Sequence, residues 1–178
     1  MEHESPAGWR MAMLSHVGRV RARNEDFVFC DEALGIAVLA DGMGGHAGGN
    51  VAARLAVDAW VGRIRKCLVE PLGERDLRVA VADANRVVFA AACADPALRR
   101  MGTTLVAACF RRDDTLLTCN VGDSRLYRLR GDVLSCLTRD HSVLRAQCDA
   151  GMIESESNGP LALRGLLTRA VGVAACVV

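Results

Sequence analysis

Two groups of acidic residues near the N-terminus have the side chains that a divalent cation needs. Glu25 and Asp26 adjoin one another, and Asp41 directly follows the apolar run of residues 34–40. A carboxylate at the end of a buried strand is costly unless it is paired or binds a metal. Carboxylate oxygens are hard ligands, so the expected ion is Mg²⁺ or Mn²⁺ rather than zinc.

The glycines that follow Asp41 support such a site. Five of them lie between positions 42 and 49, and a backbone without side chains can approach a ligand closely and offer carbonyl oxygens. Upstream, Arg21, Arg23 and Glu25 would share one face of an extended chain, with Asn24 and Asp26 on the other. Taken singly, each acidic cluster is more typical of a turn cap or of surface charge than of a metal site.

The composition is that of an ordinary globular domain. The chain has 178 residues, of which 51% are hydrophobic and 24% charged, and this suits one domain. We expect a polar tail over residues 1–9 and a folded domain over residues 10–178. The net charge of +1 gives no electrostatic reason to expect nucleic acid or an anionic membrane as a partner. The apolar stretch 170–178 is too short to cross a bilayer.

The cysteines indicate a reducing compartment. The sequence has eight cysteines and no C-x-x-C pair, and its cysteines and histidines lack zinc spacing. Several lie in apolar runs, as Cys109 and Cys119 do, so we expect free thiols that act as small hydrophobic residues. Because residues 1–10 also lack the apolar core of a secretory signal, the predicted location is the cytoplasm.

The hydrophobic pattern predicts an α+β fold. We expect short strands at 10–17 and 25–30, a strand buried on both faces at 34–40, and a helix that begins near Asn50. A second helix is predicted over residues 74–94. An antiparallel meander should then cover 103–110, 115–121, 124–130 and 133–137, followed by a helix near 140–150.

Six short motifs occur in a characteristic order. They are Val20-Arg21-x-x-Asn24-Glu25-Asp26, Ala40-Asp41-Gly42-Met43-Gly44-Gly45-His46, Met101-Gly102-Thr103-Thr104, Asn120-Val121-Gly122-Asp123-Ser124-Arg125, Thr138-x-Asp140-His141-Ser142 and Leu167-Thr168-Arg169-Ala170-x-Gly172. From about Leu14 to Gly172 the chain therefore resembles the bacterial branch of the PP2C-type (PPM) metal-dependent serine/threonine protein phosphatases.

The resemblance implies an α-β-β-α sandwich of two antiparallel sheets flanked by helices, with two, or at most three, Mn²⁺ or Mg²⁺ ions at one end. Asp41 would bridge two ions, with Glu25 and the Gly42 carbonyl as further ligands. Asp26 would support a water on the metal, and Asp123 would help to hold a third ion. Arg21 would bind the substrate phosphate. The expected partners are phosphoserine and phosphothreonine proteins, the products of a serine/threonine kinase in signalling.

The sequence departs from the family pattern in two places. Met43 follows the Asp-Gly pair, where animal members have a histidine that is proposed as a general acid, and the pattern does not assign that role to His46. The family also has two further metal-binding aspartates downstream, whereas residues 157–178 contain neither Asp nor Glu. We therefore expect a phosphatase domain that lacks its C-terminal portion. The alternative is a catalytically silent remnant that acts by binding. An apolar strand at 170–178 would be an exposed edge.

Two other motifs suggest different chemistry. Gly42-x-Gly44-x-x-Ala47 fits the G-x-G-x-x-A form of the dinucleotide fingerprint, but Asp41 would place a negative charge beside the pyrophosphate. Cys119-x-x-Gly122-x-x-Arg125 matches the C-x5-R loop of thiol-based phosphatases, which needs a thiolate of low pKa at a helix start. Asp123 lies inside that loop, and the residues after it read as a strand.

Overall fold

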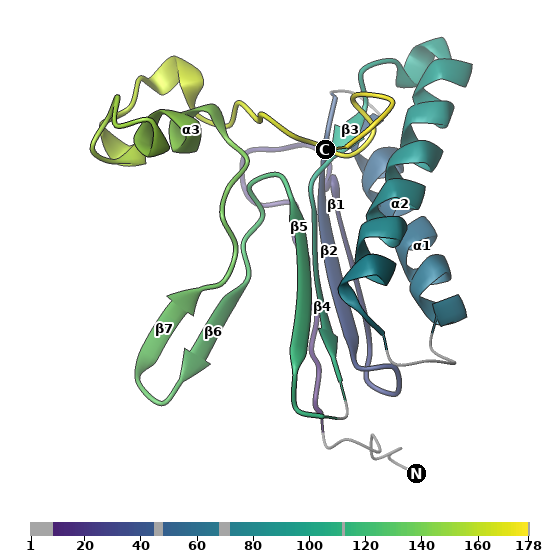
Figure 1. Ribbon diagram of the computed structural model, residues 1–178. Helices are drawn as coiled ribbons and strands as arrows, with labels where there is room; N and C mark the ends of the chain where they lie inside the picture. The colour runs from purple at the N-terminus through teal and green to yellow at the C-terminus, as the bar shows by residue number, and fades with distance from the viewer. Residues whose placement is uncertain (1–8, 45–47, 68–71, 112, 178) are drawn as a thin grey trace.

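The computed structural model describes residues 9–44, 48–67, 72–111 and 113–177. Its centre is an antiparallel sheet with two long helices packed on one face (Figure 1). A separate two-stranded hairpin and a small helical unit extend from the edge of this sheet. His46 and Ala47 lie outside the described residues.

The main sheet has the order β1-β2-β4-β5, and the short strand β3 also pairs with β2. Its strands are β1 (Asp26–Asp31), β2 (Ile36–Met43), β3 (Gly102–Thr103), β4 (Leu105–Phe110) and β5 (Leu116–Val121). Every pairing is antiparallel. The register between β1 and β2 sets Asp26 directly opposite Asp41.

The hydrophobic core lies between the main sheet and helices α1 (Gly48–Cys67) and α2 (Glu74–Ala94). Alternate residues of β2 point to this core, so that Ile36, Val38 and Ala40 are buried. Trp60 of α1 is fully buried against them. Burying apolar side chains on one face of the sheet is the main force that holds the helices there.

The hairpin β6 (Tyr127–Arg130) and β7 (Val133–Cys136) forms its own sheet. After it come α3 (Val143–Asp149) and the 3-10 turns η2 (Glu156–Asn158) and η3 (Leu161–Leu163); another such turn, η1 (Pro96–Leu98), follows α2. Arg125 joins the start of the hairpin to the segment beyond it, because its guanidinium donates to both carboxylate oxygens of Asp140 at 2.7–3.1 Å.

Most predicted elements are present, with four differences. The predicted meander is broken, because 105–110 and 116–121 belong to the main sheet whereas 127–130 and 133–136 form the separate hairpin. The strand predicted at 10–17 is wrong, because these residues make no strand pairing. Ala12, Met13 and Leu14 instead border a groove on the sheet face opposite the helices. The helix expected to start near Asn50 already includes Gly48.

The strand predicted at 170–178 is also wrong. Val171 pairs with Thr103 in a single bridge, and the backbone then turns at Gly172, where φ is +89°. The buried side chain of Asn85 holds this turn, accepting from the Gly172 N–H at 2.7 Å and donating to the carbonyls of Ala174 and Ala175. These hydrogen bonds tie the segment to α2.

The mixed α and β architecture with antiparallel sheets agrees with the predicted fold class. In the described part of the chain, both long helices cover the same face of the main sheet, so the flanking by helices is one-sided (Figure 1). None of the helices described is long and apolar enough to cross a membrane. The boundary between the tail and the domain stays a prediction, although Trp9 packs its ring against Phe110.

Candidate metal and phosphate site

Antiparallel pairing brings the two predicted acidic clusters together. Asp26 begins β1 and Asp41 lies near the end of β2, directly across from it. The pKa of Asp41 is raised to about 6, chiefly by partial burial, then by the charge of Asp26 and a hydrogen bond to it, and next by the charge of Asp123. Arg21 opposes this shift. Crowded carboxylates of this kind favour a bound proton or a bound cation.

Glu25 lies where β2 meets the start of α1. Its carbonyl accepts from the Gly42 N–H at 3.1 Å. A Cβ on Gly42 would be 2.0 Å from the Gly49 carbonyl oxygen, and one on Gly49 would be 2.6 Å from Oε1 of Glu25. Glycine is therefore required at both positions. The glycines near Asp41 thus let a strand, a helix start and a carboxylate come together, as their spacing suggested.

Arg21 lies at the mouth of this cluster. Its guanidinium is 3.2 Å from the Glu25 carboxylate, and its side chain is 70% exposed while that of Glu25 is 15% exposed. The segment before β1 is not extended as we expected, since residues 18–20 form a turn and 22–23 a bend. Because the arginine is exposed and held by one carboxylate, it is free to turn its planar donors toward a phosphate.

The charge of Asp123, in the loop after β5, contributes to the raised pKa of Asp41, although Asp123 does not line the pocket described below. A chain of hydroxyl contacts fixes that loop. The Asp41 N–H donates to the Thr104 hydroxyl at 2.9 Å, and that hydroxyl is 2.7 Å from Ser124 Oγ. Thr103 donates its own hydroxyl to the Asp41 carbonyl at 2.9 Å. Both threonines are buried.

Several of these supporting residues had no assigned role in the sequence analysis. Thr103, Thr104 and Ser124 occur in the motifs, but a small polar residue in an apolar run gives no sign of what it contacts. Asn24 is a further example. Its side chain accepts from the Asp26 N–H at 3.1 Å and donates to Ser15 Oγ at 2.6 Å, so it joins the segment before β1 to the site.

A pocket of about 350 Å³ opens at this place. Its acidic lining residues are Glu25, Asp26 and Asp41. The other polar lining residues are arginines at 19, 21 and 23, a histidine at 16 and Asn24. Carboxylates beside exposed arginines can accommodate a cation and a phosphate together.

The donor atoms fit a divalent cation, although the set is incomplete. The charge of Asp26 destabilises the charged form of Asp41, which a cation would relieve. Among the described residues, however, no group of three or more His, Cys, Asp or Glu side chains converges closely enough to hold a metal. Backbone oxygens such as the Gly42 carbonyl, together with water, would have to complete the coordination.

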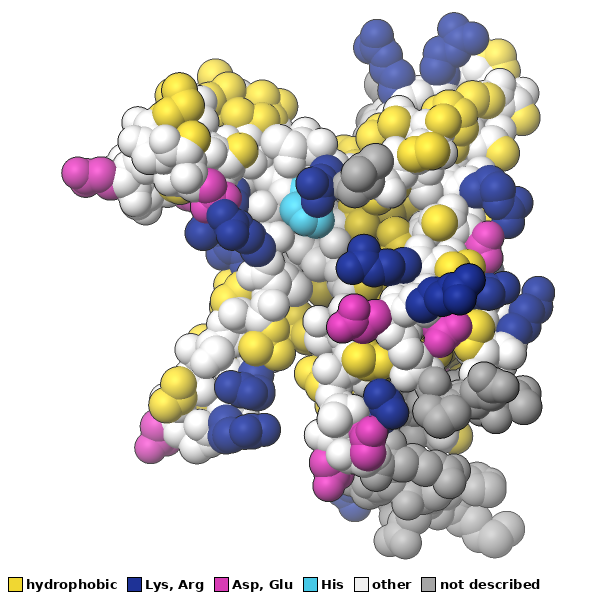
Figure 2. Space-filling view, viewed as in Figure 1, with side chains coloured by type: hydrophobic (Ala, Val, Ile, Leu, Met, Phe, Trp, Pro, Cys, Tyr) yellow, Lys and Arg dark blue, Asp and Glu magenta, His cyan; other side chains and the backbone are white. Residues whose placement is uncertain are grey.

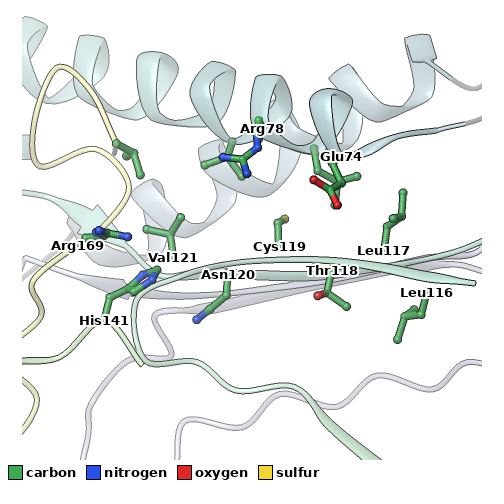
Figure 3. A pocket seen from close by; sticks show the side chains of 13 residues that line it. Glu74, Arg78, Leu116, Leu117, Thr118, Cys119, Asn120, Val121, His141 and Arg169 are labelled. Atoms are coloured by element: carbon green, nitrogen blue, oxygen red, sulfur yellow. The ribbon is translucent and has the colours of Figure 1, made fainter. Parts of the chain in front are cut away.

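A second, larger pocket lies away from the predicted site. It measures about 810 Å³ between α2 and β5, and basic side chains surround an apolar hollow there (Figure 2). Leu117, Cys119 and Val121 point from β5 toward α2, while Arg169 and His141 lie together at one end (Figure 3). None of the predicted site residues lines this pocket, so we place the chemistry at the smaller one.

The structure does not favour the two other motifs. Burial raises the pKa of Cys119 to about 12, and Arg125 is paired with Asp140, so no thiolate loop forms. The dinucleotide fingerprint needs a parallel βαβ unit, whereas β2 pairs antiparallel with both of its long neighbours. The end of that motif, with Ala47, lies outside the described residues.

Comparisons with known proteins agree with this architecture. A family profile described as "Protein phosphatase 2C" matches residues 15–148. The serine/threonine phosphatase stp of Listeria innocua is 37% identical over 163 residues, which is 88% of this chain and 64% of the Listeria protein. This chain therefore spans less than two thirds of that relative.

Two solved structures of PstP phosphatases have the same fold. PstP/Ppp of Mycobacterium tuberculosis is 36% identical, with a TM-score of 0.79 over 90% of this chain and 67% of that one. The catalytic domain of PstP in complex with two manganese ions is 34% identical, with a TM-score of 0.75 over 92% and 67%. The fold is that of these solved phosphatase structures. The chain belongs to the protein phosphatase 2C family.

Proposed function

We propose that this protein is a metal-dependent phosphatase that hydrolyses phosphoserine and phosphothreonine in proteins. The observation that carries the proposal is the cross-strand pair of Asp26 and Asp41, with the exposed guanidinium of Arg21 beside it. The manganese ions named for the related PstP structure support a divalent cofactor, which we take to be Mn²⁺ or Mg²⁺. Two or three ions would match the family pattern.

Each site residue has a proposed role. Asp41, Glu25 and the Gly42 carbonyl would hold the metal ions, and Asp123 would contribute to a looser one. When bound, such ions neutralise charge on a phosphate and lower the pKa of water. Asp26, directly across from Asp41, would orient a water molecule for attack. Arg21 would bind the phosphate through two parallel N–H donors, so that the phosphorus faces the carboxylates.

The substrates and the cellular location of the protein are also proposals. The substrates would be proteins phosphorylated by a serine/threonine kinase, in line with the names of the relatives. We place the protein in the cytoplasm. The support is cysteine usage: Cys109 is a buried free thiol whose pKa burial raises to about 12, which is typical of a small core residue.

Hydrolysis of para-nitrophenyl phosphate by the purified chain tests the proposal. We expect turnover in Mn²⁺ that stops when EDTA is added. Asp41→Asn should remove it, since the substitution deletes a ligand charge, whereas Asp132→Asn on the hairpin should not. A folded wild-type chain that is inactive in Mn²⁺ and Mg²⁺ would contradict the proposal, and so would equal activity of Asp41→Asn.

One observation favours a second candidate. Because no three metal-binding side chains converge among the described residues, the chain is also a candidate for a phosphoprotein-binding domain without turnover. In that case a phosphothreonine peptide should bind and remain intact, and Arg21→Ala should weaken its binding. Phosphate release from the same peptide decides between the two functions.

A further inference from the structure

The strand β5 leaves one of its edges without a partner. It is the last strand of the main sheet, and in the described part of the chain it pairs only with β4. A free edge presents a row of backbone N–H and C=O groups, which is a template for a further strand. Charged side chains or a proline commonly block such pairing. The sequence of β5, Leu-Leu-Thr-Cys-Asn-Val, contains neither.

The pocket of about 810 Å³ extends along this whole edge. All six residues of β5 line it, whereas a cavity on one face of the strand would be lined by alternate residues only. Leu77 and Val81 of α2 line it as well. Leu117, Cys119 and Val121 point toward α2 (Figure 3). The pocket therefore combines a free backbone edge with an apolar hollow, and these are the two surfaces that an added strand contacts.

The charged residues of this pocket are separated along the strand. Arg169 and His141 lie toward the Val121 end of β5 (Figure 3). Glu74 lies toward the other end, near Leu117 (Figure 3). Within the described part of the chain, no ion pair involves Arg169 or Glu74. A strand that continues the antiparallel pairing of the sheet would begin beside the arginine and end beside the glutamate.

We propose that the edge of β5 is a docking site for an extended segment of a separate polypeptide, which adds to the main sheet as an antiparallel strand. The recognised segment has apolar side chains at alternate positions, an acidic residue at its N-terminal end and a basic residue at its C-terminal end. Its backbone pairs with β5, and its apolar side chains fill the hollow beside α2. This site is distinct from the candidate metal site, because no described residue lines both pockets.

Isothermal titration calorimetry with a short peptide tests the docking site. The probe is acetyl-Glu-Thr-Val-Thr-Val-Thr-Lys-amide, in which the valine and charged side chains share one face of a strand. It should bind the full chain. The scrambled peptide acetyl-Glu-Val-Val-Thr-Thr-Thr-Lys-amide directs one valine away from the hollow and should bind about tenfold more weakly. The probe N-methylated at its fourth and fifth residues should also bind more weakly, since one of two adjacent residues must donate its N–H toward β5.

Exchanging the charges tests the direction of the added strand. The peptide acetyl-Lys-Thr-Val-Thr-Val-Thr-Glu-amide should bind the wild type about fivefold more weakly than the probe at low salt, because two exposed ion pairs are lost. The double variant Glu74→Arg/Arg169→Glu should reverse this order. Arg75→Glu/Glu154→Arg is the matched control, because both residues are exposed and neither lines the pocket. It should keep the wild-type order, and circular dichroism should show both variants folded.

The possible outcomes are distinct. No binding of the probe by the folded chain would overturn the inference, and so would equal binding of the scrambled or N-methylated peptide. Analytical ultracentrifugation should show a monomer. A dimer that does not bind the probe would mean that a second copy covers the edge, which also overturns the inference. None of these results depends on phosphatase activity, so hydrolysis of para-nitrophenyl phosphate tests the proposed function separately.

Discussion

Asp41 is held in place by its backbone while its side chain stays available for chemistry. Thr104 accepts from its N–H, and Thr103 donates to its carbonyl, both at 2.9 Å. Buried polar groups that are satisfied in this way fix a geometry, because losing one partner leaves the other unpaired. At the residue scale, the site therefore depends on threonines that do not touch a substrate.

Thr104→Val should show this dependence. Valine has nearly the same shape but offers no oxygen to the Asp41 N–H or to Ser124. We expect a loss of about 1–3 kcal/mol in the free energy of unfolding, measured by urea denaturation, together with weaker Mn²⁺ binding. Thr118→Val is the control, because Thr118 is exposed on β5, where such changes stay within about 0.5 kcal/mol. Equal stability of the two variants would contradict the role of Thr104.

The end of β2 and the start of α1 approach each other too closely for side chains. Gly42 and Gly49 provide that space, and the contact places the Glu25 carboxylate beside the helix start. Partial positive charge at a helix N-terminus favours such a carboxylate. At the scale of elements, the site lies at one end of the main sheet, where two strands, the start of a helix and the loop after β5 meet.

Substituting alanine for Gly42 and for Gly62 should have opposite effects on the stability of the protein. Gly42→Ala would place a methyl group 2.0 Å from the Gly49 carbonyl oxygen, so β2 and α1 must separate. We expect a marked fall in the midpoint of thermal unfolding. Gly62→Ala, inside α1 with open space around it, should instead stabilise the protein by about 0.5–1 kcal/mol through helix propensity. A harmless Gly42→Ala would mean that this close contact is not formed.

The loop between β5 and β6 depends on a neutral histidine. The Gly122 N–H donates to Nδ1 of His141 at 3.2 Å, and burial and the charge of Arg169 lower the pKa of His141, although Asp140 opposes them. Protonation would abolish this hydrogen bond, since Nδ1 would become a donor. At acidic pH the unfolded chain therefore binds this proton more readily than the folded protein does.

The contribution of His141 to the stability of the protein should accordingly fall in mild acid, whereas the raised pKa of Asp41 acts in the opposite direction. In the folded protein the pKa of His141 lies below the usual 6.5. Its contribution to the free energy of unfolding is therefore complete above about pH 6.5 and is lost as the pH falls below that value. Urea unfolding at pH 7.5, 6.5 and 5.5 should show the wild type losing its stability advantage over His141→Gln as the pH falls. The same slope for both proteins would refute this assignment.

On the scale of the whole molecule, periodicity and motif order predicted most of the fold. The apolar run 34–40 and the helical pattern 74–94 correspond to β2 and α2, because burial imposes those patterns directly. Antiparallel pairing then explains how motifs far apart in the sequence meet, as Asp41 and Thr104 do. The family resemblance is confirmed by the comparisons.

The remaining features depend on partners that a local pattern cannot reveal. Residues 10–17 and 170–178 are apolar enough for strands, but a strand also needs a hydrogen-bonding neighbour; Asn85 instead holds the second segment in a turn. Gly122-Asp123 resembles a hairpin turn, yet it is where the chain leaves the main sheet. Similarly, the role of Thr104 becomes visible only when β2 and β4 are paired.

The central claim is that the carboxylates at the ends of β1 and β2 form a divalent-cation site. A titration with Mn²⁺, in which electron paramagnetic resonance measures the free ion, tests this without requiring turnover. We expect the wild-type chain to remove free Mn²⁺ from solution and Asp41→Asn to bind much less, while both remain folded by circular dichroism. Equal binding by the two proteins, or no binding by the folded wild type, would contradict the account.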